Sequence, residues 1–167
     1  FQAAFRRVVD HLKDRGVDNF ATVMGSSSFL QPDSIWNLYW PGDDYVDWVG
    51  ISIFGHAYGG TDFGPDCEAV LQFAKQHQKP VMISEANPIN GIEKDNPEVW
   101  EKWFVNFLSF TYNKNIKAIS FINEDWSATG IAGIDLIIRY HKVVRVGPQH
   151  LLRIFEGIAH IRDKTLF

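Results

Sequence analysis

Cysteine is almost missing from this sequence, and strongly charged segments are missing altogether. Cys67 is the single cysteine among 167 residues, so the chain can form no internal disulfide and no metal site built on several thiolates. Charged residues make up 22% of the chain, the formal net charge is −4, and no long run of Lys or Arg occurs. These shortages argue against nucleic acid or an anionic membrane as the main partner, but they permit a neutral ligand such as a sugar.

Long apolar runs are missing as well. No run of about 18 apolar residues exists, so we expect no transmembrane helix. Charges interrupt the apolar positions of residues 1–16, so we do not expect this segment to be a signal peptide. Phe1, Phe5 and Leu12 instead follow helical spacing, and Gly16 is a typical stop signal, which together predict a helix over this range.

Aromatic residues, in contrast, are abundant. The chain has 13 Phe, six Trp and five Tyr, which make up 14% of its residues. Most of the Phe side chains are expected in the core. Trp is more often partly buried and offers a flat face to a ligand. Three tryptophans fall in expected loops: Trp36, Trp40 and Trp126. Each of them has two possible roles there, contact with a ligand or anchoring of the loop.

Short apolar segments alternate with helical patterns along most of the chain. Strands are predicted at residues 20–24, 46–54, 81–84 and 118–122, and helices at residues 66–77 and 97–113. We expect a long aromatic loop from residue 25 to residue 45, in which Asp43 and Asp44 follow Pro-Gly and form a turn. The strands are apolar throughout, which favours a parallel sheet covered by helices.

Polar residues follow the predicted strands at the ends where such folds carry their chemistry. His56, Glu85 and the segment 123–126 all come directly after a strand. Glu85 is poorly explained as a surface charge, because it follows four apolar strand residues. Glu124 and Asp125 are expected to have a structural role or to hydrogen-bond a substrate.

Three stretches resemble glycoside hydrolase family 26, the β-mannanase family. Residues 40–52, WPGDDYVDWVGIS, resemble the family's segment that enters strand six of its barrel. Residues 79–85, KPVMISE, are similar to the segment that ends in the catalytic nucleophile, and residues 116–126 to strand eight with its sugar-binding tryptophan. The resemblance implies an α/β fold, the C-terminal half (strands 5–8) of a TIM (β/α)8 barrel.

The resemblance also implies a division of the chain and a setting for it. Residues 1–126 would form the half-barrel of a catalytic domain, and residues 127–167 a divergent segment that completes or covers it. Within that segment, residues 134–138 and 143–146 look like strands and residues 148–160 like a helix. We expect an extracellular protein whose partners are a polysaccharide or oligosaccharide and the missing N-terminal half-barrel or another subunit.

Site residues carried over from the family begin with Glu85 as the nucleophile of a retaining glycosidase. Phe54 stands where the family has a tyrosine that hydrogen-bonds the nucleophile, and Tyr58 is the candidate substitute. Trp126 is expected to stack on a sugar. His56 and Asn87 are candidates to hydrogen-bond sugar hydroxyls, and Trp40 to line the outer cleft. The family's general acid belongs to strand four, which would lie upstream of Phe1.

Two functions therefore remain open. The first is retaining endo-hydrolysis of a β-linked polysaccharide such as mannan, with an acid/base Glu from outside these residues. The second is a pseudoenzyme that binds carbohydrate or has a structural role. We expect no cofactor and no metal, because no Gly-rich phosphate loop occurs and the His residues lack metal-ligand spacing. Residues 26–28 are serines without the Gly-x-Ser-x-Gly pattern of serine hydrolases.

Overall fold

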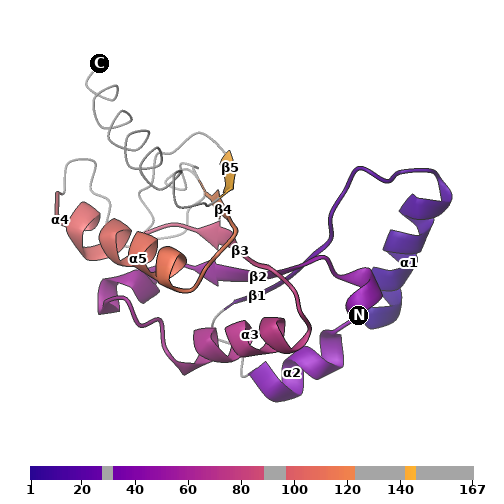
Figure 1. The fold of residues 1–167 in the computed structure, drawn as a ribbon, viewed down its shortest axis with the longest axis horizontal. Coiled ribbons are helices and arrows are strands. Elements are labelled where there is room, and N and C mark those ends of the chain that lie inside the picture. Colours follow the sequence, from indigo (N-terminus) through magenta and orange to yellow (C-terminus); the bar gives the residue numbers. More distant parts are fainter. Residues whose placement is uncertain (28–31, 89–96, 123–141, 146–167) are drawn as a thin grey trace, which may run out of the picture.

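A computed structural model describes residues 1–27, 32–88, 97–122 and 142–145. Its centre is one sheet in the order β1-β2-β3-β4-β5 (Figure 1). The strands are β1 Val23–Ser27, β2 Trp48–Ile53, β3 Val81–Ala86, β4 Ala118–Phe121 and β5 Lys142–Arg145. The first four pair in parallel, which confirms the parallel α/β unit expected from the sequence.

The helices lie between the strands, as expected for parallel connections. They are α1 Gln2–Asp14, α2 Pro32–Tyr39, α3 Pro65–Gln76, α4 Pro97–Val99 and α5 Val105–Asn113. A π-helical segment, η3 Trp100–Phe104, joins α4 to α5, so the helix predicted at residues 97–113 is continuous. Two short 3-10 turns, η1 Asp43–Tyr45 and η2 Gly55–Gly59, flank β2.

The loop expected at residues 25–45 is wrong over part of its length, because it contains α2. Pro32 begins this helix, where a missing N–H costs nothing. Trp36 is only 2% exposed, and its ring stacks on Phe73 of α3 with centroids 5.1 Å apart. An eight-residue helix is marginal by itself, so this contact between helices accounts for the element that local sequence signals did not reveal.

The two faces of the sheet differ in chemistry. Val49, Ile51 and Ile53 of β2 are fully buried and belong to the apolar core beneath the helices. Between them stand Gly50 and Ser52, which by alternation point to the opposite face. The strands are therefore not uniformly apolar: one face is aliphatic, and the other carries small and polar residues.

Gly50 shows how closely neighbouring strands approach one another on the polar face. A Cβ atom at this position would lie 3.0 Å from Val23 Cγ1 and 3.0 Å from Ser84 Oγ. A side chain here would need the Val23 and Ser84 side chains to give by a few tenths of an ångström. Glycine avoids this crowding where β1, β2 and β3 lie side by side near the candidate site.

The last described strand changes the direction of the sheet. β5 pairs antiparallel with β4, from Ala118 opposite Arg145 to Phe121 opposite Lys142. It includes most of the strand-like segment expected at residues 143–146, whereas the segments expected at residues 134–138 and 148–160 lie outside the described residues. None of the described helices combines the length and the apolar character that crossing a membrane requires.

Candidate functional site

Glu85 reaches the polar face of the sheet through an irregularity in strand pairing. Ile51 of β2 pairs with Ile83, but the next residue, Ser52, pairs with Glu85, so Ser84 is passed over. Without this β-bulge, Ser52 would pair with Ser84, and Glu85 would point to the helix-covered face with Ile53. Bulges often redirect side chains beside active sites. This one places the exposed carboxylate of Glu85 on the same face as Gly50 and Ser52, opposite the aliphatic face of β2.

A hydrogen bond fixes one oxygen of the Glu85 carboxylate. Ser52 Oγ donates to Glu85 Oε2 over 2.9 Å, and Ser52 is only 7% exposed. Glu85 Oε1 has no hydrogen-bond partner among the residues that the structure describes. The carboxylate is therefore held at one oxygen and accessible at the other, which suits a nucleophile or a group that accepts hydrogen bonds from a ligand.

The turn after β2 brings further polar groups to the same end of the sheet. Phe54 follows the strand, and His56 and Tyr58 lie in η2. Two side chains from the helical run after β3 hold this turn: Trp103 Nε1 donates to the Phe54 carbonyl over 2.5 Å, and Asn106 Nδ2 donates to the Ala57 carbonyl over 2.8 Å. Trp103 comes from the π-helical segment, a feature that is frequent at functional sites.

His56 is held in the neutral tautomer that carries its proton on Nε2. Its Nδ1 accepts the backbone N–H of Phe54 over 3.1 Å, which leaves the proton of a neutral ring on Nε2. Partial burial lowers the pKa of His56 below its ordinary value, so the neutral ring is favoured near neutral pH. A neutral imidazole that donates from Nε2 is suited to bind a sugar hydroxyl.

Tyr58 does not take the place of the missing tyrosine in the structure. Burial raises the pKa of its hydroxyl, and this buried oxygen has no hydrogen-bond partner among the described residues. Glu85 is instead bound by Ser52. The structure thus brings Tyr58 to the same turn as His56 but shows no bond between it and the carboxylate.

Asn87 joins three strands just beyond β3. Its backbone N–H donates to the Ile53 carbonyl over 3.2 Å, and its Nδ2 donates to the Ile122 carbonyl, also over 3.2 Å. The side chain is 3% exposed, and its Oδ1 has no partner in the described part of the chain. Asn87 therefore aligns the ends of β2, β3 and β4, with one acceptor left over.

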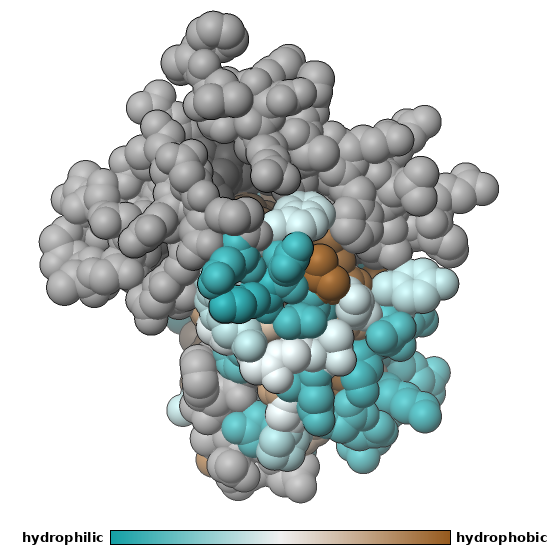
Figure 2. Space-filling view, turned by 90° about the vertical axis from the view of Figure 1, so that its left-hand side faces the viewer, coloured by the Kyte–Doolittle hydropathy of each residue, from teal (hydrophilic) through white to brown (hydrophobic). Residues whose placement is uncertain are grey.

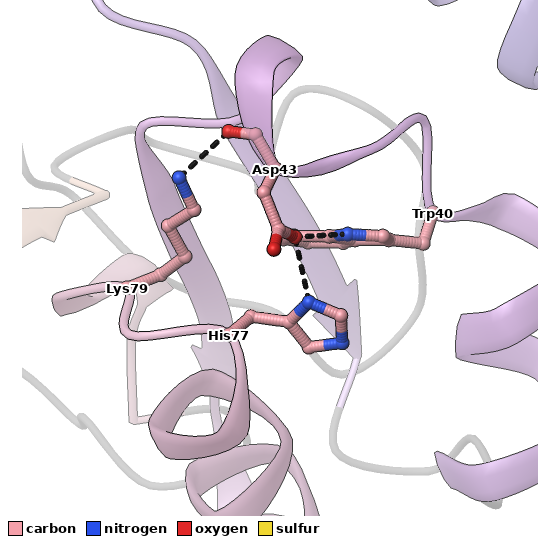
Figure 3. Close-up of polar contacts among 4 residues, drawn as sticks. All are labelled: Trp40, Asp43, His77 and Lys79. Carbon is pink, nitrogen blue, oxygen red and sulfur yellow. Dashed lines mark hydrogen bonds and ion pairs between the residues drawn. The ribbon is translucent and has the colours of Figure 1, made fainter.

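Trp40 lies at the opposite end of the sheet. Its Nε1 donates to Asp43 Oδ1 over 2.8 Å, and His77 Nδ1 lies 2.6 Å from the same oxygen (Figure 3). Lys79 lies two residues before β3 begins, and its Nζ donates to the Asp43 carbonyl. Lys79 and Glu85 are six residues apart along an extended strand, roughly 20 Å. The structure therefore does not bring Trp40 to Glu85.

Other expected participants lie elsewhere or cannot be placed. Trp126, Glu124 and Asp125 lie outside the described residues. Within the described ranges, no group of three or more His, Cys, Asp or Glu residues is arranged to hold a metal ion. Figure 2 shows the side toward which the strands of Figure 1 point, where the described surface is mostly hydrophilic with one small apolar patch.

Comparison with known proteins decides the family. The family model described as glycosyl hydrolase family 26 matches residues 1–143. The chain belongs to glycosyl hydrolase family 26. A β-1,3-xylanase from Vibrio sp., TXYA, is 29% identical over 147 residues, and a β-1,3-xylanase from Alcaligenes sp. is 30% identical over 147 residues. Each match covers 75% of this chain, and 31% and 30% of the two enzymes.

Solved structures of the family confirm the fold. The catalytic domain of the Bacillus sp. JAMB-750 endo-β-1,4-mannanase aligns with a TM-score of 0.56 at 18% identity, over 81% of this chain and 40% of that one. A modular endo-β-1,4-mannanase from Cellulomonas fimi aligns with a TM-score of 0.58 at 22% identity, over 95% and 34%. The chain thus matches part of a family 26 TIM barrel, and it spans about a third of the length of these relatives.

Sequence reasoning missed the residues that support the family 26 site. Ser52 lies within the family-like segment at residues 40–52 but was not singled out. Its position between Ile51 and Ile53 was a usable signal, because it is a polar residue in an otherwise apolar strand. Trp103 lies in the predicted helix at residues 97–113 but was not singled out. Its hydrogen bond to Phe54 depends on a contact between residues 49 positions apart, which no local pattern reveals.

Proposed function

We propose that this family 26 chain contributes the nucleophile of a retaining glycanase, and that Glu85 is that residue. One observation carries the proposal: the bulge places Glu85 on the polar face of the sheet, where Ser52 holds one carboxylate oxygen. A surface carboxylate needs neither a strand irregularity nor a buried hydrogen-bond donor. Membership in a family of glycoside hydrolases supports the same role.

The reaction would proceed in two displacements. Glu85 attacks the anomeric carbon of the bound sugar, and the new carbon–oxygen bond replaces the glycosidic bond as it breaks. The departing oxygen takes a proton from a carboxylic acid, which a part of the barrel outside these 167 residues would supply. Water then attacks the same carbon, gives its proton to that carboxylate and releases Glu85.

The substrate would be a β-linked polysaccharide outside the cell. The relatives named as β-1,3-xylanases are 29–30% identical to this chain, whereas the endo-β-1,4-mannanases are 18–22% identical. β-1,3-Xylan is therefore the first substrate to test, and β-1,4-mannan the second. His56 would donate from Nε2 to a sugar hydroxyl at the same site, Asn87 would contribute by aligning the strand ends, and Trp126 would provide a stacking surface.

The decisive variant is Glu85→Gln, assayed in the full-length protein on both polysaccharides. It removes the nucleophile but keeps the shape of the side chain, so kcat/KM is expected to fall by at least about 10³-fold. Glu101→Gln is the matched control, because Glu101 is an exposed residue of η3, and it should keep wild-type activity. Unchanged hydrolysis by Glu85→Gln would refute the proposal.

A trapping experiment identifies the role of Glu85 directly. A 2-fluoro glycosyl fluoride slows the second displacement, so the sugar should accumulate on the nucleophile and increase the intact mass by one glycosyl group. Peptide mapping should place the adduct on Glu85. If the protein binds polysaccharide but neither hydrolyses it nor forms the adduct, the chain is a pseudoenzyme that binds carbohydrate.

A further inference from the structure

Ser52 stands at the point where this chain departs from the pattern of its family. The resemblance puts Phe54 at the place of the family's orienting tyrosine, and Phe54 has no hydroxyl. The only described side chain that hydrogen-bonds Glu85 is Ser52, whose Oγ lies 2.9 Å from Oε2. Ser52 comes from the neighbouring strand and is almost fully buried, so its position is set by the sheet itself.

We infer that Ser52 is the positioning residue for Glu85, in place of the tyrosine hydroxyl. This inference depends on the proposed role of Glu85 as nucleophile. Oε2 accepts a hydrogen bond from the Ser52 hydroxyl, and Oε1 is left to attack the sugar. Because Ser52 and Glu85 are direct partners across the bulge, the rigid backbones of β2 and β3 fix the direction of the carboxylate.

The test is the kinetics of Ser52 variants of the full-length protein, with kcat and KM measured separately. Ser52→Ala and Ser52→Cys remove the strong donor with little change in size. Each should lower kcat by about tenfold and leave KM nearly unchanged, because the carboxylate is no longer held in the direction of attack. Ser52→Thr keeps the hydroxyl and should keep a kcat near that of the wild type.

Ser84→Ala is the matched control. Ser84 is the residue passed over in the bulge, and no hydrogen bond between it and Glu85 exists in the described structure. Its removal should leave kcat near that of the wild type. An unchanged kcat in both Ser52→Ala and Ser52→Cys, or an equal loss of kcat in Ser52→Thr, would overturn the inference. The proposed function is judged separately, because it fails only if Glu85→Gln remains active.

Discussion

The two ends of the sheet use similar residues for different purposes. At the amino end, the Asp43 carboxylate receives hydrogen bonds from Trp40 and His77 (Figure 3). At the carboxyl end, Glu85 receives one hydrogen bond, from Ser52, and its other oxygen is unpaired among the described groups. Both donors to Asp43 bind the same oxygen, Oδ1, and come from two different parts of the chain, so this carboxylate joins elements of the fold. Glu85 is bound by one neighbouring strand and can accept a ligand at Oε1.

The comparison also explains what the family signature does. Two of its three aspartates bind the chain itself: Asp43 joins the start of η1 to the end of α3, and Asp47 Oδ2 accepts the backbone N–H of Thr22 over 2.7 Å. The most recognisable motif therefore builds the barrel wall. Glu85, the proposed nucleophile, lies at the opposite end, as expected for barrels of this kind.

The largest effect on stability should come from removing the Trp40 side chain at the amino end of the sheet. Trp40 is 8% exposed, and its ring meets Phe73 edge to face with centroids 5.0 Å apart. Trp40→Ala should lower the free energy of unfolding by about 3–5 kcal/mol, measured by urea denaturation. Leu38→Ala, in the helix α2 that ends just before Trp40, changes a side chain that is 69% exposed and should cost less than about 0.5 kcal/mol. Equal costs would contradict the structural role of Trp40.

A smaller effect is expected at Trp103, which packs against Phe107 and also holds the turn η2 at the carboxyl end of the sheet. Trp103→Phe keeps the ring that stacks on Phe107 but removes the hydrogen bond to the Phe54 carbonyl. Because that carbonyl is partly buried, the change should cost about 1–3 kcal/mol of stability. Hydrogen exchange should rise in the turn η2, which carries His56.

Tyr112→Phe provides the comparison for Trp103→Phe. Tyr112 lies in the same helical run and is 60% exposed, so the loss of its hydroxyl should leave both stability and exchange near wild type. If Trp103→Phe leaves exchange in η2 unchanged, the hydrogen bond does not hold the turn. The carboxyl end would then depend on the strands alone.

Much of this architecture was predictable from the sequence, because apolar runs and helix boundaries are local signals. The four parallel strands and the helices at residues 66–77 and 97–113 follow from such patterns. The helix α2 was not predictable, since its formation depends on Trp36 packing against α3. Tertiary contacts of this kind override local preference.

The site was predictable in part. Glu85 was found because it follows an apolar strand, but the face it occupies was not, because a one-residue bulge leaves no mark on composition. For the same reason, Ser52 could not be assigned as the partner of Glu85. Trp40 illustrates the opposite difficulty: tryptophan beside a turn suits either a sugar or a carboxylate of the chain, and only the structure shows Asp43 beside its ring.

The smallest expected effect concerns the charge at the amino end. Hydrogen bonds from His77 and then Trp40 are the main causes that lower the pKa of Asp43 below its ordinary value of 3.8. The unfolded chain therefore binds this proton more readily than the folded chain. The stability that Asp43 contributes is full above about pH 4 and is lost as the pH falls through the lower folded value.

Asp43→Asn removes this dependence. Near pH 6 the variant should be less stable than wild type by under about 1 kcal/mol, because the Asp43 side chain is 56% exposed and solvent screens its charge. The difference should shrink below about pH 4, as wild-type Asp43 becomes protonated. Asp44→Asn, at the exposed neighbouring residue, should differ from wild type by the same small amount at both pH values. A difference for Asp43→Asn that does not change between pH 6 and pH 3 would mean that the shape of the side chain, rather than its charge, anchors this end of the sheet.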